Sequence, residues 1–183
     1  METITKEGER FKGIIRPLRK EDIPYLRPIS EFWLRDGNAV ADNEVDGDMA
    51  TCRRSLIPGS GKTMFVAESP DGTVIGMMGL SDEPKDALKP FAQLNNPCEV
   101  IVAYVHPDHM MGKGVGTALM NKVLELAQTK GKTEILVDSG PRHIETGHPF
   151  YDKQPGLERV RKIPNFYGDG QDTQVWRKTL EEK

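Results

Sequence analysis

The sequence contains little cysteine and no long apolar run, and both absences exclude classes of protein. Its only cysteines are Cys52 and Cys98, too few for the disulfide framework of a small secreted domain. No apolar stretch approaches the roughly 18 residues that a membrane-spanning helix needs. The polar N-terminal segment, residues 1–13, lacks the apolar core of a secretion signal. We therefore expect reduced, structural cysteines in a cytoplasmic protein with no membrane partner.

An excess of one charge is also missing. Lys and Arg together number 25 and Asp and Glu 28, for a formal net charge of −3. This balance provides no general attraction to nucleic acid, so no nucleic-acid partner is expected. A chain of 183 residues fits one domain that buries roughly 70% of its unfolded surface. We predict a single domain over residues 1–183, with residues 1–10 flexible.

Hydrophobic periodicity predicts a mixed α/β sheet rather than a regular βαβ winding. The predicted strands are 11–18, 64–68, 74–80, 99–105, 134–138, 157–163 and 173–180, and the predicted helices are 19–36, 49–56, 115–130 and a short one opening at Pro149. The Asp71-Gly72 pair between two apolar runs indicates a hairpin. The acidic segment 36–48 is interpreted as a solvated loop or, alternatively, as a negative rim that attracts a cationic substrate.

A glycine-rich turn, Met111-Gly112-Lys113-Gly114-Val115-Gly116, lies between the apolar strand 99–105 and the amphipathic helix 115–130. A helix start leaves about four backbone N–H groups without intrahelical partners, and glycine lets a ligand approach the backbone closely. The turn is therefore a candidate site for phosphate or pyrophosphate. The alternative is a tight connection that binds no ligand.

Two further patterns point away from other functions. Residues 59–63, Gly-Ser-Gly-Lys-Thr, resemble the end of a Walker A loop, but Leu56 stands where that pattern needs glycine. A helix-like segment also precedes the stretch and a strand follows it, the reverse of the required order, so we do not predict ATP binding there. His143 and His148 have no cysteine or third ligand nearby, and no metal site is predicted.

The turn and a later motif resemble those of the GNAT-type N-acyltransferase superfamily. Its pyrophosphate signature, Gln/Arg-x-x-Gly-x-Gly/Ala, matches residues 111–116 at both glycines, with Met111 in place of Gln or Arg. The lead-in Tyr104-Val105-His106-Pro107 resembles the family's strand end. A Phe-Tyr-x-Lys-x-x-Gly stretch matches residues 150–156, and Ile144 stands where the family often has Asn. The resemblance extends over residues 13–180 and is specific for 98–157.

The resemblance implies a GNAT-like fold, with a mixed, mostly antiparallel central sheet flanked by helices. It implies acetyl-CoA as cosubstrate, no metal, and direct attack by a primary amine of a small molecule or peptide. A homodimer is compatible with it. The cofactor-binding residues that it implies are Tyr104, Val105, Met111, Gly112, Lys113, Gly114, Val115, Gly116 and Thr117.

Glu99 is the candidate general base. An alkylamine has a pKa near ~10.4, so it arrives protonated and must lose a proton before it attacks. Glu99 is the one charged residue on an otherwise apolar strand, where desolvation should raise its pKa to a useful value. The alternative is a strand-end glutamate that faces solvent.

By the same resemblance, the backbone N–H around Val105, where the family's strand bulges, donates to the oxyanion. Tyr151 is the candidate general acid for the leaving thiolate, and its alternative is a packing tyrosine. The last loop offers further candidates for the acceptor site: Tyr167, Asp169 and Asp172.

Two other functions stay open. In a dinucleotide-binding oxidoreductase, Gly112-x-Gly114 and Asp138 would form part of the fingerprint. Against this reading, its third glycine would fall at Thr117, and six residues separate Val105 from Gly112. A non-catalytic acyl-CoA-binding domain on the same fold is the second alternative, because a fold does not determine a function.

Overall fold

The computed structural model describes residues 11–110 and 112–180, so the predicted flexible segment 1–10 lies outside the described residues. The chain forms two compact units. The first contains the residues up to Leu80 and Val102–Val123, and the second contains Ser81–Ile101 and the residues from Leu124 onward. Strand β6 (Pro97–Val105) and helix α3 (Val115–Thr129) each contribute to both units. Neither unit is therefore one continuous stretch of chain.

The strands of the first unit follow the order β1-β4-β5-β6. Their bounds are β1 Ile14–Pro17, β4 Lys62–Glu68 and β5 Val74–Ser81. β1 pairs antiparallel with β4, with Ile14 opposite Glu68. The turn between β4 and β5 closes with a 2.9 Å hydrogen bond from the Ser69 N–H to the Thr73 carbonyl. Gly72 has a φ of +86° there, which confirms the predicted hairpin.

The helices of the first unit differ most from expectation. The structure has a 3-10 turn at Lys20–Asp22, α1 at Ile23–Trp33, the short strands β2 Arg35–Asp36 and β3 Ala39–Val40, and α2 at Asp42–Ser55. The prediction of a loop over residues 36–48 was thus wrong. Asp42 and Glu44 lie in the first turn of α2, where negative charge stabilises the positive end of the helix dipole.

Helical spacing explains which faces α1 and α2 bury. Val45, Met49 and Cys52 fall on one side of α2 and are at most 1% exposed. Leu26 and Ile29 of α1 are equally buried. These side chains form the helical part of the core of the first unit.

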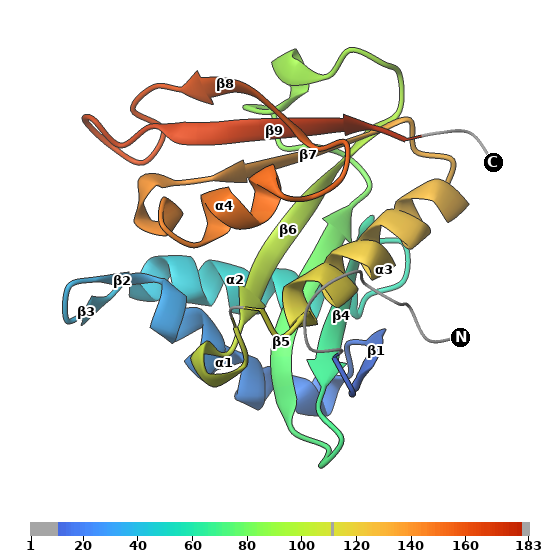
Figure 1. Ribbon diagram of the computed structural model, residues 1–183, viewed down its shortest axis with the longest axis vertical. Coiled ribbons are helices and arrows are strands. Elements are labelled where there is room, and N and C mark those ends of the chain that lie inside the picture. Colours follow the sequence, from blue (N-terminus) through green and yellow to red (C-terminus); the bar gives the residue numbers. More distant parts are fainter. Residues whose placement is uncertain (1–10, 111, 181–183) are drawn as a thin grey trace. The chain divides into compact units, whose positions relative to one another are not determined.

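The strands of the second unit follow the order β6-β7-β9-β8. Their bounds are β7 Glu134–Ser139, β8 Glu158–Ile163 and β9 Thr173–Thr179. β6 runs parallel to β7, and β9 pairs antiparallel with both β7 and β8. The expected mixed, mostly antiparallel sheet with flanking helices is confirmed (Figure 1).

Strand register sorts the side chains of this second sheet onto two faces. Glu99 lies opposite Leu136, and Asp138 lies opposite Val175. Because alternate residues share a face, these four side chains lie on the same side, where Leu136 and Val175 pack with Leu88. The other face carries Val137 and Trp176, which are opposite each other.

Helix α4 (Gly147–Asp152) packs on that other face through Tyr151, whose ring centroid lies 5.2 Å from that of Trp176. α4 begins at Gly147 rather than at the predicted Pro149. Proline is tolerated in a first turn because its missing N–H would have no intrahelical partner.

α3 ends as predicted. The N–H of Gly131, which has a φ of +65°, donates to the Gln128 carbonyl, and the N–H of Lys132 donates to that of Ala127. Short 3-10 turns complete the described part of the chain at Lys89–Phe91, Pro107–His109 and Pro141–His143. Among the described residues, no helix has the length and apolar character needed to cross a membrane.

Candidate functional site

In the first unit, a turn with two left-handed glycines connects β6 to α3. Gly112 has a φ of +77° and Gly114 a φ of +76°, values that favour glycine strongly. The first helical hydrogen bond of α3 runs from the Ala118 N–H to the Gly114 carbonyl, at 2.9 Å. The N–H groups of the three preceding residues therefore have no intrahelical partner. Alternating backbone conformations followed by a helix start form a concave arrangement of N–H groups that suits an anion.

The space beside Gly112 is open. Among the described residues other than its chain neighbours, no atom lies within 4 Å of a Cβ placed on Gly112, so these residues leave room for a ligand there. The Lys113 ammonium reaches back to the Asp108 carbonyl at 2.7 Å and closes the loop on the side of Pro107–His109. The residues fit a diphosphate. Met111, the first position of the predicted signature, lies outside the described residues.

β6 is distorted before it reaches the turn. Val102 has a φ of +47°, which is a genuine outlier for a β-branched residue and costs on the order of 1–3 kcal/mol. The pairing of β6 with β7 runs from Pro97 to Glu99. The expected irregularity of this strand therefore exists, but it lies at Val102, three residues before Val105. Strain of this kind collects at ligand sites.

Trp33, at the end of α1, holds the far end of β6. Its indole N–H donates to the Val105 carbonyl at 2.8 Å, and its ring stacks on Tyr104 with centroids 6.4 Å apart. The next N–H, that of His106, donates to the Ile75 carbonyl at 2.8 Å. The peptide after Val105 is therefore fixed on both sides. Trp33 falls within the predicted helix 19–36, but no pattern in the sequence predicted this contact.

In the second unit, Glu99 lies in a buried ion cluster. Its side chain is 6% exposed, its Oε2 accepts the backbone N–H of Lys85 at 2.7 Å, and its Oε1 lies 3.4 Å from the Lys85 ammonium. The alternative of a solvent-facing glutamate is therefore wrong. Burial raises the pKa of Glu99, as its place on an apolar strand predicted, although Lys85 opposes that rise.

Asp138 of β7 completes this cluster. Its Oδ1 lies 2.6 Å from the Lys85 ammonium, and its Oδ2 accepts the Thr173 hydroxyl at 3.0 Å. The carboxylate of Asp138 also raises the pKa of Glu99. The sequence offered Asp138 only as part of a nucleotide-binding fingerprint, and Lys85 was not predicted at all. Only the parallel register of β6 and β7 brings the two carboxylates onto one face.

Tyr151 lies on the other face of the same sheet. Tyr151 is 6% exposed, and its ring contacts those of Phe150 and Trp176. Burial, with a smaller effect of Asp138, raises its pKa. Tyr151 is therefore a hydroxyl that keeps its proton. The two predicted catalytic residues therefore lie on opposite faces of the sheet of the second unit.

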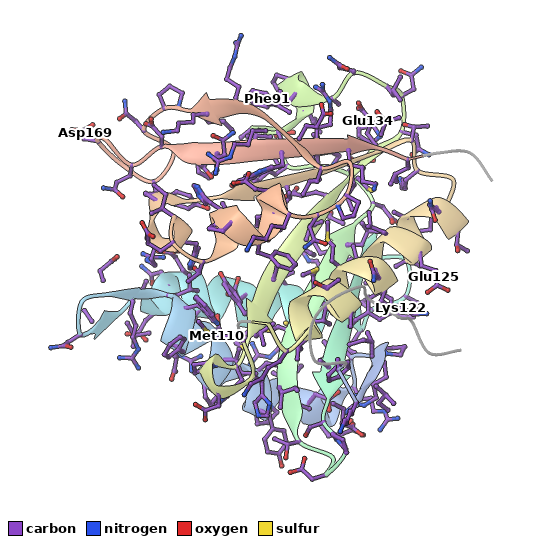
Figure 2. The ribbon with its side chains drawn as sticks, viewed as in Figure 1. Phe91, Met110, Lys122, Glu125, Glu134 and Asp169 are labelled. Atoms are coloured by element: carbon purple, nitrogen blue, oxygen red, sulfur yellow. The ribbon has the colours of Figure 1, made fainter. Side chains whose placement is uncertain are left out.

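The loop between β8 and β9 uses most of its polar groups internally. The N–H of Asn165 donates to the Asp172 carboxylate at 3.0 Å, and the N–H of Gly170 donates to the Asn165 side chain at 2.7 Å. Asp169 lies at the tip of this loop (Figure 2). The ring of Tyr167 packs on Gly140. A Cβ added to Gly140 would lie 2.8 Å from a ring carbon of Tyr167. Asp172 thus stabilises the loop by accepting a backbone N–H, whereas Tyr167 packs against the segment after β7.

The acidic residues of α2 also have partners. Asp46 lies 2.8 Å from an Arg27 nitrogen, and the Asp48 carboxylate accepts the Ser30 hydroxyl at 2.5 Å. Burial raises the pKa of Asp48 to about 6. Two members of the predicted negative rim are therefore engaged in the contact between α1 and α2.

In the part of the chain that the structure describes, no group of three or more His, Cys, Asp or Glu side chains is placed to hold a metal ion. The Nε2 of His148 lies 3.0 Å from the Ser139 carbonyl and 3.2 Å from that of Gly140. Since both neighbours accept, this nitrogen carries the proton. His148 is therefore a buried side chain that hydrogen-bonds to the end of β7 and the residue after it.

A comparison with protein families assigns the chain. The model of the acetyltransferase (GNAT) family matches residues 23–154. The chain belongs to this family. It is therefore an acyltransferase. No curated protein sequence matches the chain closely enough to count as a relative.

Several solved structures share the fold. NAA60 from Arabidopsis thaliana, solved with a bisubstrate analogue, has a TM-score of 0.71 and 15% identity, with 94% of this chain and 100% of that chain covered. YncA from Salmonella typhimurium, solved with its cofactor acetyl-CoA, has a TM-score of 0.68 and 20% identity, with coverages of 94% and 96%. The spermidine/spermine N-acetyltransferase SpeG from Vibrio cholerae has a TM-score of 0.61 and 16% identity, with 92% of both chains covered.

Proposed function

We propose that this GNAT protein transfers an acetyl group from acetyl-CoA to a primary amine of a small molecule or peptide by direct attack. The observation that carries the proposal is the turn before α3, with Gly112 and Gly114 at positive φ and open space beside Gly112. In this proposal the chain is one acyltransferase domain, because β6 and α3 run through both units.

The cofactor would be held largely by backbone. The N–H groups of Gly112–Thr117 include those at the positive end of α3 and suit a diphosphate, whose charge they would stabilise without a metal. Tyr104 and Val105, at the end of β6, would line the path of the acyl arm. When bound, acetyl-CoA supplies the acyl group as an activated thioester. The Val105 N–H precedes a peptide fixed by Trp33 and is our candidate donor to the developing oxyanion.

Glu99 would take the proton of the incoming ammonium. Its Oε1 is the less engaged of its two oxygens, since its Oε2 holds the Lys85 N–H at 2.7 Å. Burial raises the pKa of this carboxyl and thereby its affinity for the proton. Tyr151, whose pKa burial also raises, would stay protonated and donate a hydrogen bond to the departing sulfur.

The acceptor is proposed as a class only. SpeG is named for spermidine and spermine, and another structure of this fold is an aminoglycoside 6'-N-acetyltransferase solved with coenzyme A. We extend this acceptor chemistry, a primary amine, to the present chain as a proposal. We propose a cytoplasmic location because Cys52 and Cys98 are both free and buried. Burial raises the pKa of each thiol to about 12.

The cofactor class can be tested by thermal unfolding with acetyl-CoA, NAD or ATP–Mg at equal concentration. A ligand at ~100 times its dissociation constant adds about 2.7 kcal/mol to the free energy of unfolding. We expect acetyl-CoA alone to raise the unfolding midpoint. A rise with NAD and none with acetyl-CoA would contradict the proposal and favour a dinucleotide-binding oxidoreductase.

A further inference from the structure

The ammonium of Lys85 lies between two carboxylates of neighbouring strands, but not midway between them. It is 2.6 Å from the Asp138 Oδ1 and 3.4 Å from the Glu99 Oε1. The side chains of Asp138 and Glu99 are 5% and 6% exposed, and that of Lys85 is 38% exposed. Lys85 therefore covers two buried carboxylates and forms its short contact with Asp138.

The remaining contacts of the cluster reinforce this asymmetry. The Asp138 Oδ2 accepts the Thr173 hydroxyl at 3.0 Å, and the Glu99 Oε2 accepts the Lys85 backbone N–H at 2.7 Å. Within the described residues, the Glu99 Oε1 is thus the carboxylate oxygen of this pair whose nearest polar contact is longest. It is the oxygen best able to accept a proton from outside the cluster.

The position of the ammonium is also supported from the loop between β8 and β9. The Phe166 ring centroid lies 5.3 Å from the Lys85 Nζ, within the range of a cation–π contact. Asp138 and Phe166 therefore hold the Lys85 ammonium, while the backbone N–H of Lys85 donates to Glu99. The cluster thus contains two carboxyl groups and one amino group.

We propose that Asp138 is a positioning residue: it draws the Lys85 ammonium to 2.6 Å from its own Oδ1 and leaves the longer contact of 3.4 Å to the Glu99 Oε1, so that this oxygen can receive the proton of the acceptor amine. This inference rests on the proposed function, in which Glu99 is the base. It assigns roles to Lys85 and Asp138 that follow from the register of β6 and β7 and from the distances within the cluster.

The electrostatics agree with the geometry. Burial raises the pKa of Glu99, Lys85 lowers it, and Asp138 raises it again. Burial alone would lower the pKa of Lys85, but Asp138 and Glu99 raise it overall. Other titratable groups are coupled to this cluster: Tyr167 also raises the pKa of Lys85, Asp138 raises the pKa of Tyr151, and Glu99 raises the pKa of Cys98, its neighbour on β6.

Two substitutions should shift the pKa of Glu99 in opposite directions. In Asp138→Asn the ammonium keeps Glu99 as its only carboxylate partner, so the acid limb of the pH profile of kcat/KM should move to lower pH. In Lys85→Met Glu99 loses its cation, so the same limb should move to higher pH. One neighbouring charge shifts a titration by about 1 pH unit or more. Lys85→Arg, which restores the charge, should return the limb toward that of the wild type.

The Glu99 carboxyl itself is followed by carbon NMR of protein labelled at the glutamate side chains, with Glu99→Gln identifying its signal. Unfolding midpoints and acetyl-CoA affinity show whether each variant folds. Opposite shifts of this signal, followed by the activity profile, support the proposal. If the signal does not move, or moves the same way in both variants, the inference about Asp138 is overturned. If the signal moves as expected while the activity limb stays, Glu99 is not the base, and both the mechanism and the positioning role fail.

Discussion

Replacing Gly112 with alanine should separate the cost of a strained backbone from the loss of a ligand contact. An L residue in the left-handed region costs about 1–2 kcal/mol relative to glycine. A Cβ at Gly112 meets no atom within 4 Å, so we expect no steric cost beyond this value. Bound acetyl-CoA is different, because the same Cβ would stand beside the N–H groups that we propose for its diphosphate. Losing one charge-assisted hydrogen bond costs about 1.5–3 kcal/mol, or roughly tenfold or more in affinity.

Gly72 provides a matched control. It has a φ of +86°, lies in the same unit, and also has no atom within 4 Å of an added Cβ. Urea unfolding should show that Gly112→Ala and Gly72→Ala lose similar stability. Calorimetric titration with acetyl-CoA should show weaker binding for Gly112→Ala alone. Equal affinities in the two variants would refute the assignment of the anion site to this turn.

Three further predictions concern single side chains. Tyr151→Phe should lower kcat about 100-fold with little change in the KM for the amine, since it removes one transition-state hydrogen bond; unchanged steady-state kinetics would leave Tyr151 a packing residue. Trp33→Phe removes the bond to the Val105 carbonyl and should lower the free energy of unfolding, measured in urea, by about 1 kcal/mol. The pKa of Asp48, raised by burial to about 6, means that the folded state binds this proton more tightly than the unfolded state. The contribution of the protonated Asp48 to the free energy of unfolding is therefore fully present below the pKa of the unfolded state, near 4, and is lost as pH rises through about 6. Urea unfolding should show that the free energy of unfolding falls by up to about 3 kcal/mol over this pH range, and that Asp48→Asn removes this fall. The same pH dependence in Asp48→Asn would contradict the assignment to Asp48.

The elements that carry local signals were predictable from the sequence. The apolar run before Val105, the turn at Gly112 and Gly114, and the helix that ends before Gly131 all form where the pattern placed them. In each case the signal is contained in neighbouring residues, such as a glycine needed at positive φ. The start of α2 was missed because its first turns are acidic and read as a loop, although Val45, Met49 and Cys52 already showed helical spacing.

The environment of the predicted catalytic residues depended on contacts between distant segments. Lys85 approaches Glu99 from a loop 14 positions earlier in the chain, and Asp138 reaches the same ammonium from the next strand. Trp33 contacts Val105 across 72 positions. No local pattern encodes these distances, because they follow from sheet register and from the packing of α1. The position of Glu99 on its strand could be predicted, but its ion partners could not.

Acetyl transfer to an amine tests the central claim most directly. The protein is incubated with acetyl-CoA and, separately, spermidine, an aminoglycoside and a peptide with a free amino group. Acetylated amine is measured by mass spectrometry and free thiol by a colorimetric reagent. We predict that at least one amine yields amide and thiol in equal amounts, and that Glu99→Gln binds acetyl-CoA normally but forms product about 100-fold more slowly or worse. Tight binding of acetyl-CoA with no amide from any amine, or wild-type rates in Glu99→Gln, would contradict the account.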